Sequence, residues 1–483
     1  MLCFVGVLQF VVICLAGLST LYVFAFHSIS LAMVLSAWRE VRKQRVSEPD
    51  EMGRVARDLE SLPGISVIVP AYNEQVAIVR TVRSILALSY PKLEVLVVND
   101  GSTDRTMARL QAAFDLKPCN RRAREVLPTQ RIRAVFEGSE EPRLVVADKR
   151  NGGKADALNA GIGLASHELV CAIDADVVLD SDALLHLVRP FVDDPHTVAT
   201  SGMIRLINGC SVDEATSVVS PGMPKRFIER MQVAEFIRSF SLGRLFFNTI
   251  NAHLIISGAF GLFRRSVLLD LEGYQVHSIG EDMEIVVRMH ALLREQRKPY
   301  SIVYVADAVA FTEGPLSWPD LGKQRSRWHQ GLLSTLRLHR RIFLNPTYGA
   351  VGWVAYPYFF FFELFSPLVE LFGWVALPVF WSLGCIPFSV AWPFFAVSFG
   401  LGVTVTLHAV LLDFVAFRHF SRLRHVLILC GSALLEPLGY HQFILYHRCR
   451  AFFQYYGTIH LRGGWKSPER AVDNESAGEC ESA

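Results

Sequence analysis

Three zones follow one another along the 483-residue chain, and they differ in how their apolar residues are spaced. The first zone, residues 1–38, contains no Asp, Glu, Lys or Arg. Such a run is longer than the roughly 20 apolar residues that a membrane-spanning helix needs. A cleavable signal peptide would start with basic residues and have a shorter apolar core. We therefore predict an N-terminal transmembrane anchor at residues 1–38.

Basic residues directly after this anchor predict its orientation. Arg39, Arg42, Lys43 and Arg45 follow the apolar run at once. Basic residues close to a membrane span are retained on the cytoplasmic side. We therefore expect a multi-pass protein of the inner (plasma) membrane whose next domain is cytoplasmic.

The second zone, residues 64–315, consists of short runs rich in Val and Ile, separated by helix-like stretches. Such runs, alternating with helices, are typical of a parallel sheet that is covered on both faces. We therefore predict an α/β domain with a mainly parallel sheet. Ligands bind at the carboxyl ends of the strands in such sheets, where polar residues cluster in this chain. The predicted strands are 65–70, 93–100, 143–148 and 168–176.

The third zone, residues 350–448, is again strongly apolar and predicts a C-terminal transmembrane region. The segments 352–378 and 386–413 are each long enough to span a membrane with some tilt. Glu363 and Glu370 lie within the first of them, and we expect both to face the protein interior or a water-filled passage.

Two further C-terminal segments are less regular. Residues 425–447 have basic residues at both ends, so they suit an interfacial or re-entrant element better than a third crossing. Residues 449–483 form the expected cytoplasmic tail, and its last part has the composition of a disordered segment.

Composition narrows the function further. The formal net charge is only +2, whereas nucleic-acid-binding proteins normally carry a strongly basic surface, so we exclude that class. The nine cysteines show neither a CxxC pair nor zinc-ligand spacing, and they predict reduced thiols.

Asp174 and Asp176 lie one residue apart at the end of a predicted strand, so their side chains point to the same face. A divalent cation shared with a diphosphate explains why two carboxylates stand together, and Mg²⁺ and Mn²⁺ prefer such oxygen ligands. The alternative is a solvated strand end whose acids cap the next helix.

Similar polar groups follow the other predicted strands. Asp100 precedes a glycine turn and suits a hydrogen bond to a ribose or a base, while Ser102, Thr103 and Asp104 can cap the following helix. Tyr72 offers a stacking face and Glu74 an acceptor. Lys154 follows a double glycine at a helix start, where cations and exposed amides suit phosphate; a plain basic turn is the alternative.

Two later stretches carry further candidates. Asp282 precedes an apolar-periodic helix, where it either caps the helix or removes a proton from an acceptor hydroxyl. Gln324, Arg327 and Trp328 share one helix face in residues 316–348, a predicted amphipathic interface helix. Arginine binds diphosphate through its planar fork, and tryptophan provides a surface for stacking a sugar ring.

The order of these motifs resembles the processive family 2 glycosyltransferases, which include cellulose, chitin, hyaluronan and poly-N-acetylglucosamine synthases. The matching stretches are VIVPAYNE, VVNDGSTD, DAD, GED and QRSRW. The resemblance implies a GT-A type fold, a nucleotide-diphospho-sugar donor and inversion at the anomeric carbon. It also implies nucleoside contact by Asp100, metal and diphosphate binding by Asp174 and Asp176, and base catalysis by Asp282. Gln324, Arg327 and Trp328 would bind the diphosphate and the acceptor end.

The expected function is therefore transfer of sugar from UDP-N-acetylglucosamine or UDP-glucose to a growing polysaccharide, with Mg²⁺ or Mn²⁺ as cofactor and extrusion across the lipid bilayer. Addition of a single sugar to a membrane lipid is an alternative reaction. An inactive transport or scaffold protein is an alternative of another class, and the intact acidic residues argue against it. An export partner stays open.

Overall fold

A computed structural model describes residues 17–18, 21–42, 59–121, 123, 127–212, 219–384, 387–417, 420 and 422–458. Most of the first half of the predicted anchor, Lys43, Arg45 and the tail beyond residue 458 lie outside the described residues.

A ten-stranded mixed sheet forms the centre of the domain, in the order β3-β4-β5-β2-β1-β6-β11-β8-β12-β7. The four predicted strands are β1 (Ile65–Ala71), β2 (Leu93–Asn99), β5 (Leu144–Lys149) and β6 (Leu169–Ala172), and they form a continuous parallel block. Antiparallel pairs extend this block on both sides, and β8 and β12 pair in parallel. The α/β prediction is confirmed, and the parallel part of the sheet is its middle.

The remaining strands were not predicted from the sequence. They are β3 (Leu116–Pro118), β4 (Ile132–Gly138), β7 (Val178–Leu179), β8 (Thr197–Leu206), β11 (Gly261–Arg264) and β12 (Ser301–Thr312), with β9 (Ser211–Val212) and β10 (Val219–Ser220) in a separate pair.

Both faces of the sheet are covered, and every residue of β1 is therefore buried. Val67 and Val69 belong to the core on one face, together with α2 (Ile78–Leu86) and α5 (Ala183–Asp193). Ile68 belongs to the core on the other face, with α4 (Lys154–Leu164) and α9 (Glu281–Glu295). Such complete burial explains the unbroken apolar strand sequences.

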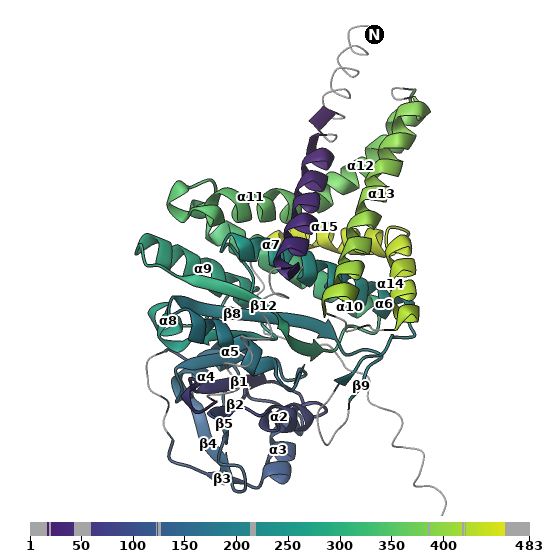
Figure 1. Ribbon diagram of the computed structural model, residues 1–483. Coiled ribbons are helices and arrows are strands. Elements are labelled where there is room, and N and C mark those ends of the chain that lie inside the picture. The colour runs from purple at the N-terminus through teal and green to yellow at the C-terminus, as the bar shows by residue number, and fades with distance from the viewer. Residues whose placement is uncertain are drawn as a thin grey trace, which may run out of the picture.

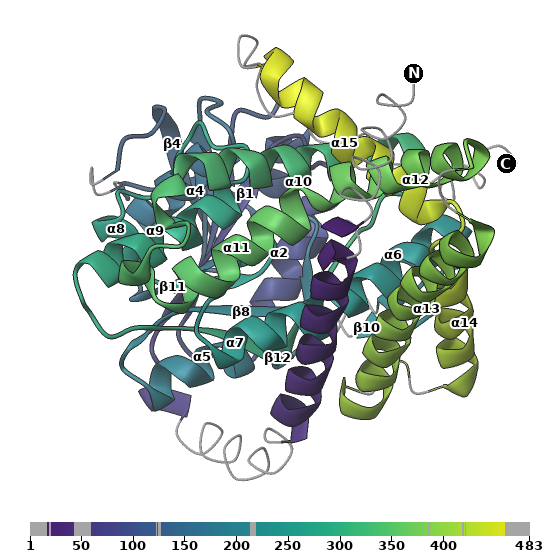
Figure 2. The ribbon, with the colours of Figure 1, turned by 90° about the horizontal axis from the view of Figure 1, so that it is seen from above.

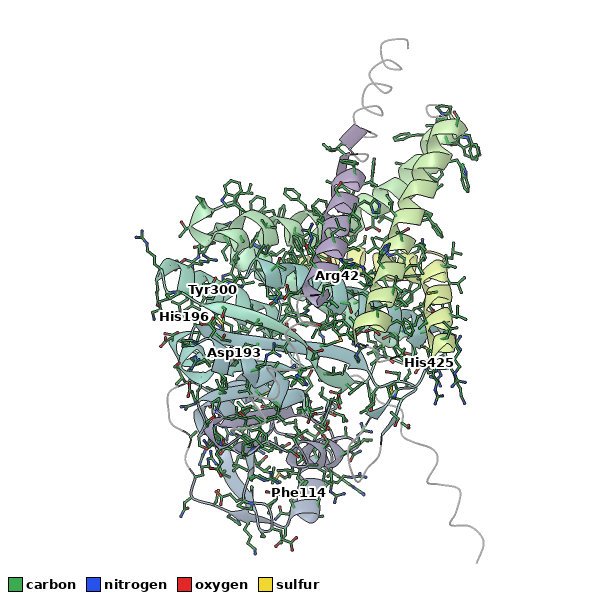
Figure 3. The ribbon with its side chains drawn as sticks, viewed as in Figure 1. Arg42, Phe114, Asp193, His196, Tyr300 and His425 are labelled. Atoms are coloured by element: carbon green, nitrogen blue, oxygen red, sulfur yellow. The ribbon has the colours of Figure 1, made fainter. Side chains whose placement is uncertain are left out.

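Within the described residues, three helices are long and apolar enough to cross a membrane: Leu21–Arg42, Val351–Ser382 and Phe399–Phe417. The first and the last of these extend from the same side of the domain, opposite β3 and β4 (Figure 1). Arg42 lies at the end of the N-terminal helix that is nearest the sheet (Figure 3). The N-terminal anchor and its cytoplasmic orientation stay predictions.

The stretch 425–447 is not one continuous helix. It is divided between α14 (Leu423–Leu435) and α15 (Tyr440–Thr458). The 13 residues of α14 extend about 20 Å, less than the roughly 30 Å of a bilayer core. Moreover, α15 lies across the direction of α13 (Phe388–Leu412) rather than along it (Figure 1). Both features suit an interfacial or re-entrant element, which stays a prediction.

The helices between the sheet and the apolar spans are α6 (Phe227–Arg238), α7 (Arg244–Thr249) and α10 (Trp318–Leu338). Helices α11 (Tyr356–Tyr358) and α12 (Ser366–Ser382) belong to the apolar segment Val351–Ser382, and α3 (Thr106–Phe114) and α8 (Arg265–Asp270) flank the sheet. Viewed from the side of the apolar helices, α10, α11 and α15 lie over the strands (Figure 2). This layer brings α10 above the strand ends.

Candidate active site

A cavity of about 2630 Å³ extends from the carboxyl ends of the central strands to the apolar helices. Two predicted site residues, Tyr72 and Asp100, do not line it. The other eight do: Glu74, Lys154, Asp174, Asp176, Asp282, Gln324, Arg327 and Trp328. Residues separated by more than 250 positions in the chain therefore share one space.

The predicted strand 168–176 is too long: β6 ends at Ala172, and the chain turns at Ala175–Asp176, where the Val177 amide donates to the Asp174 carbonyl over 3.2 Å. The Ile173 amide donates to the Ile68 carbonyl over 3.0 Å, which keeps the chain beside β1. Ile173 and Ala175 are buried, while Asp174 and Asp176 are partly exposed and line the cavity. Both carboxylates thus lie on the cavity side as predicted, but a turn after the strand, and not the alternation of an extended chain, places them there.

Lys154 extends into this acidic region from the first turn of α4. Its Nζ lies 2.6 Å from Asp174 Oδ1 and 3.4 Å from Glu281 Oε1. Burial lowers the pKa of Lys154, but the charges of Asp174, Glu281 and Asp282 raise it by more, so its pKa lies above the ordinary value. The ammonium group therefore stays charged.

Asp100 takes a different place from the one predicted. Its carboxylate is buried, forms an ion pair with Lys149, and accepts the Gly152 amide over 3.0 Å and the Gly153 amide over 2.7 Å. Burial raises the pKa of Asp100 above its ordinary value, although these partners oppose the shift. Asp100 thus folds the glycine loop that precedes Lys154, and the two glycine amides are directed at Asp100.

Gly153 shows why this loop needs glycine. Its φ of +92° is one that residues with a side chain rarely adopt. The loop therefore turns sharply into α4 and delivers Lys154 to the cavity.

The AYNE stretch is joined to the GSTD turn through Asn73, a residue that the sequence did not single out. Asn73 Oδ1 accepts the Thr103 amide over 2.8 Å, and the Asn73 amide donates to Ser102 Oγ over 3.0 Å. The N-cap residue of α3 is Arg105, whose side chain makes no capping hydrogen bond, but Asp104 just before it accepts the Thr106 amide of the first turn with Oδ1 over 2.9 Å. The Glu74 amide donates to Thr106 Oγ1 over 2.8 Å, which holds Glu74 at the cavity wall.

Asp282 occupies the first turn of α9. Its Oδ1 accepts the Met283 amide over 2.8 Å, and no described residue donates a hydrogen bond to its Oδ2. A Cβ added at Gly258 would lie 2.9 Å from Lys154 Nζ and 3.4 Å from Asp282 Cβ. The turn at residues 257–260 (SGAF), which contains Gly258, therefore passes close to both side chains. A larger residue at Gly258 would displace them.

Two glycines fix α9 against α10. A Cβ added at Gly280 would lie 3.0 Å from the Gly331 Cα, and the reverse distance is 3.1 Å. This backbone contact brings the start of α9 beside the middle of α10. This single contact between the two helices therefore positions Asp282 relative to the QxxRW residues of α10, which are Gln324, Arg327 and Trp328.

On α10, Arg327 and Trp328 are exposed, and Gln324 is partly exposed. Gln324 Oε1 is buried and has no hydrogen-bond partner among the described residues. A buried acceptor without a partner is costly unless a ligand or water satisfies it.

The acidic region has more negative than positive charge. We call the side chains of Lys154, Asp174, Asp176, Glu281 and Asp282 the carboxylate cluster; it contains one cation and four acids, all at the cavity wall. Burial and the charge of Asp282 raise the pKa of Glu281, although Lys154 acts against this. A further cation would relieve the repulsion.

The donor set fits a divalent ion that is completed by its substrate. Within the described ranges, no group of three His, Cys, Asp or Glu side chains is placed to hold a metal by itself. Magnesium-type sites commonly use one or two carboxylates together with substrate phosphates. Asp174 and Asp176 suit that arrangement.

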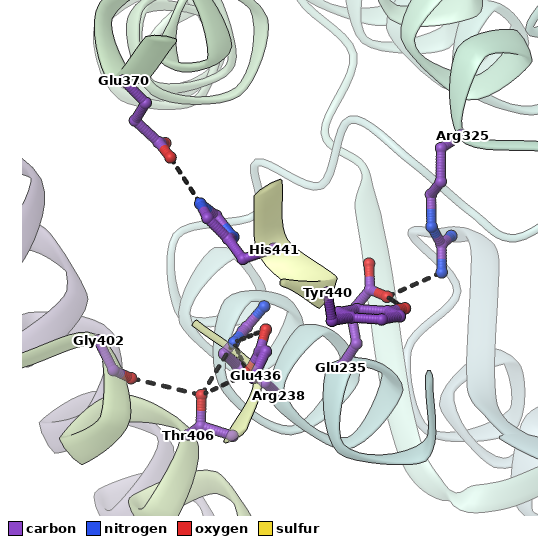
Figure 4. Close-up of polar contacts among 9 residues, drawn as sticks. All are labelled: Glu235, Arg238, Arg325, Glu370, Gly402, Thr406, Glu436, Tyr440 and His441. Carbon is purple, nitrogen blue, oxygen red and sulfur yellow. Dashed lines mark hydrogen bonds and ion pairs between the residues drawn. The ribbon is translucent and has the colours of Figure 1, made fainter. Parts of the chain in front are cut away.

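At the far end of the cavity the charges are paired (Figure 4). Arg325 contacts Glu235 at 2.8 Å, Arg238 contacts Glu436 at 2.7 Å, and His441 contacts Glu370 at 2.6 Å. These six side chains, which we call the ion-pair cluster, join α6, α10, α12 and the α14–α15 region. The prediction that Glu370 faces the interior agrees with this contact.

Comparison with known proteins identifies the family. Residues 66–271 match glycosyl transferase family 2, and residues 169–417, just over half of the chain, match glycosyl transferase family group 2. The chain belongs to the family 2 glycosyltransferases. The resemblance drawn from the motifs is confirmed.

Curated relatives share this part of the chain. The chain is 28% identical over 294 residues to the poly-beta-1,6-N-acetyl-D-glucosamine synthase of Staphylococcus aureus, covering 61% of this chain and 59% of that protein. The corresponding synthase of Staphylococcus epidermidis is 30% identical, with 62% and 65% covered. The chain thus spans less than two thirds of the length of these relatives.

A solved structure supports the fold. A mannosyltransferase from Pyrobaculum calidifontis, in complex with GDP-Man and Mn²⁺, superposes with a TM-score of 0.50 at 19% identity and covers 86% of this chain and 99% of that chain. This family 2 chain therefore has the GT-A type fold that the motifs implied.

Proposed function

We propose that this protein is an inverting membrane glycosyltransferase that adds N-acetylglucosamine from its UDP derivative to a growing polysaccharide. One observation carries the proposal: the carboxylate cluster, the QxxRW helix and the ion-pair cluster line one continuous cavity that reaches the apolar helices. The synthases of the two Staphylococcus species favour N-acetylglucosamine over glucose as the transferred sugar.

Asp282 is the proposed base. Its Oδ2 takes the proton from the acceptor hydroxyl while the oxygen forms a bond to the anomeric carbon, and the bond from that carbon to the diphosphate breaks. UDP leaves with the electron pair, and attack from the opposite face inverts the configuration.

Other residues hold the donor. Asp174 and Asp176 would hold Mg²⁺ or Mn²⁺, which supplies positive charge to the diphosphate when bound. Lys154 and Arg327 add positive charge to the leaving group, where charge develops. Asp100 contributes to donor binding indirectly, because it shapes the loop that carries Lys154.

The cavity also offers a way out for the product. Trp328 provides the stacking surface for the acceptor end, and the polar side chains of the ion-pair cluster continue the polar wall towards the apolar helices. The proposed polymer leaves the cytoplasmic site along this wall and crosses the inner membrane.

The proposal can be tested by measuring UDP release from several UDP-sugars. The purified protein is kept in detergent, and each donor is tested with and without Mn²⁺. We expect UDP release to be fastest with UDP-N-acetylglucosamine and a polymer to appear on size separation of the labelled product. A single-sugar glycolipid would instead support transfer to a membrane lipid. No UDP release from any donor would support the scaffold alternative.

A further inference from the structure

Arg325 lies between the two recognised ends of the QRSRW stretch and contacts Trp328 directly. Its guanidinium carbon is 4.2 Å from the centre of the indole ring, a distance at which a cation is attracted to an aromatic face. The Trp328 side chain is nevertheless 46% exposed. The cation therefore covers part of the ring and leaves the rest open to the cavity.

The position of Arg325 is fixed from two other helices. Arg325 Nη2 donates to Glu235 Oε2 over 2.8 Å, and the hydroxyl of Tyr440 donates to the same oxygen over 2.6 Å (Figure 4). Glu235 lies on α6 and Tyr440 begins α15. A contact among three helices thus orients a single guanidinium group.

The state of Glu235 supports this arrangement. Burial raises the pKa of Glu235, but the charge of Arg325 and the Tyr440 hydroxyl lower it by more, so the pKa lies below its ordinary value. Glu235 therefore stays ionised and holds the arginine near neutral pH.

A purely structural ion pair would normally use most of the arginine donors. Arg325 is 3% exposed, yet its Nε and Nη1 have no hydrogen-bond partner among the described residues. Because buried donors are costly to leave unpaired, the fixed position of Arg325 needs an explanation beyond stability.

We propose that Arg325, held by Glu235 and Tyr440, is a positioning residue that backs the Trp328 ring so that a saccharide ring of the acceptor stacks on its open side. This inference rests on the proposed function. It predicts that the hydroxyl of Tyr440, a residue that does not line the cavity, affects acceptor binding.

Steady-state UDP release provides the main test, with UDP-N-acetylglucosamine as donor and a β-1,6-linked N-acetylglucosamine pentasaccharide as acceptor. For Arg325→Lys we expect the half-saturating pentasaccharide concentration to rise about tenfold, because lysine keeps the charge but not the planar fork. For Tyr440→Phe we expect a rise of about threefold. The half-saturating donor concentration should change less than twofold in both variants.

Tryptophan fluorescence gives a second measurement that needs no turnover. The contribution of Trp328 is the difference between the wild-type protein and Trp328→Phe, and its change on adding pentasaccharide reports stacking. We expect this change to require a severalfold higher pentasaccharide concentration in Arg325→Lys.

Arg205→Lys is the matched control. Arg205 is also a buried arginine in a carboxylate pair, 2.7 Å from Asp413, but it does not line the cavity. Its replacement should leave the half-saturating pentasaccharide concentration unchanged.

The inference fails if wild-type protein transfers sugar while both variants keep wild-type acceptor half-saturation and fluorescence. It also fails if donor and acceptor half-saturation rise together, since that pattern indicates general loss of structure. Should Arg325→Lys not fold, Tyr440→Phe, which loses one oxygen, decides alone. Absence of UDP release in the wild type would instead overturn the proposed function.

Discussion

The two ends of the cavity differ in the balance of their charges. In the carboxylate cluster, Lys154 is shared by two acids, Asp174 at 2.6 Å and Glu281 at 3.4 Å, whereas each acid of the ion-pair cluster has its own basic partner. An unbalanced buried group costs free energy that a ligand can offset, and a balanced one is already stabilised. This difference indicates that a bound cation is to be expected at the strand ends and not beside the apolar helices.

The sharpest way to break this comparison is to remove the proposed base. Asp282→Asn should reduce UDP release about a thousandfold, within the range that general-base catalysis contributes, with little effect on donor binding. Asp193→Asn is the matched control, because Asp193 is an exposed acid on α5 that pairs with Arg189 at 3.7 Å. Near wild-type transfer by Asp282→Asn would refute the assignment.

Metal removal tests the charge imbalance itself. Chelation should abolish UDP release, and Mn²⁺ should restore it; Asp176→Asn should lose about a hundredfold even with Mn²⁺ and require more of the ion. Asp180→Asn, four positions further at an exposed site that does not line the cavity, should behave like the wild type. Full activity in the presence of a chelator would contradict the metal assignment.

The helix contact that joins the two ends can be tested at Gly331. Gly331→Ala places a methyl group about 3 Å from the Gly280 backbone, so α9 must shift. We expect a roughly tenfold loss of activity, because small displacements of catalytic groups are costly, and a destabilisation of about 1–3 kcal/mol in thermal unfolding.

Gly457→Ala is the control for this change, since the space around Gly457 is open. Equal effects of both substitutions would show that the Gly280–Gly331 contact does not position Asp282.

Much of the carboxylate cluster was predictable because it depends on local rules. Strand-end acids at i and i+2 and a lysine after a double glycine are visible in the sequence, and the sheet brings them together. Asp100 shows the limit of such reasoning. Its motif marks the right loop, but only the fold reveals that Lys149 and two amides occupy its carboxylate.

The ion-pair cluster was largely hidden because its partners are far apart in the sequence. Arg238 and Glu436 are separated by 198 positions, and no periodicity links them. Strand β12 was missed for a related reason, since it alternates buried and partly exposed residues, unlike the almost completely buried strands of the parallel block. Pairing over long distances is decided by packing, which sequence patterns record weakly.

The smallest expected effect concerns the exposed pair of the ion-pair cluster, His441 and Glu370. Burial lowers the pKa of His441, but the hydrogen bond and charge of Glu370 raise it by more, so its pKa lies above the ordinary 6.5. A raised histidine pKa contributes stability that is fully present below pH 6.5 and is lost as the pH rises through the higher folded-state value.

His441→Asn should therefore lower the thermal unfolding midpoint at pH 5.5 and match the wild type more closely at pH 8.5. Because His441 is 41% exposed, solvent screening limits the difference to less than about 1 kcal/mol. His196→Asn, at an exposed histidine without an ion pair among the described residues, should show no such pH dependence, and a His441 effect that grows with pH would contradict the pairing.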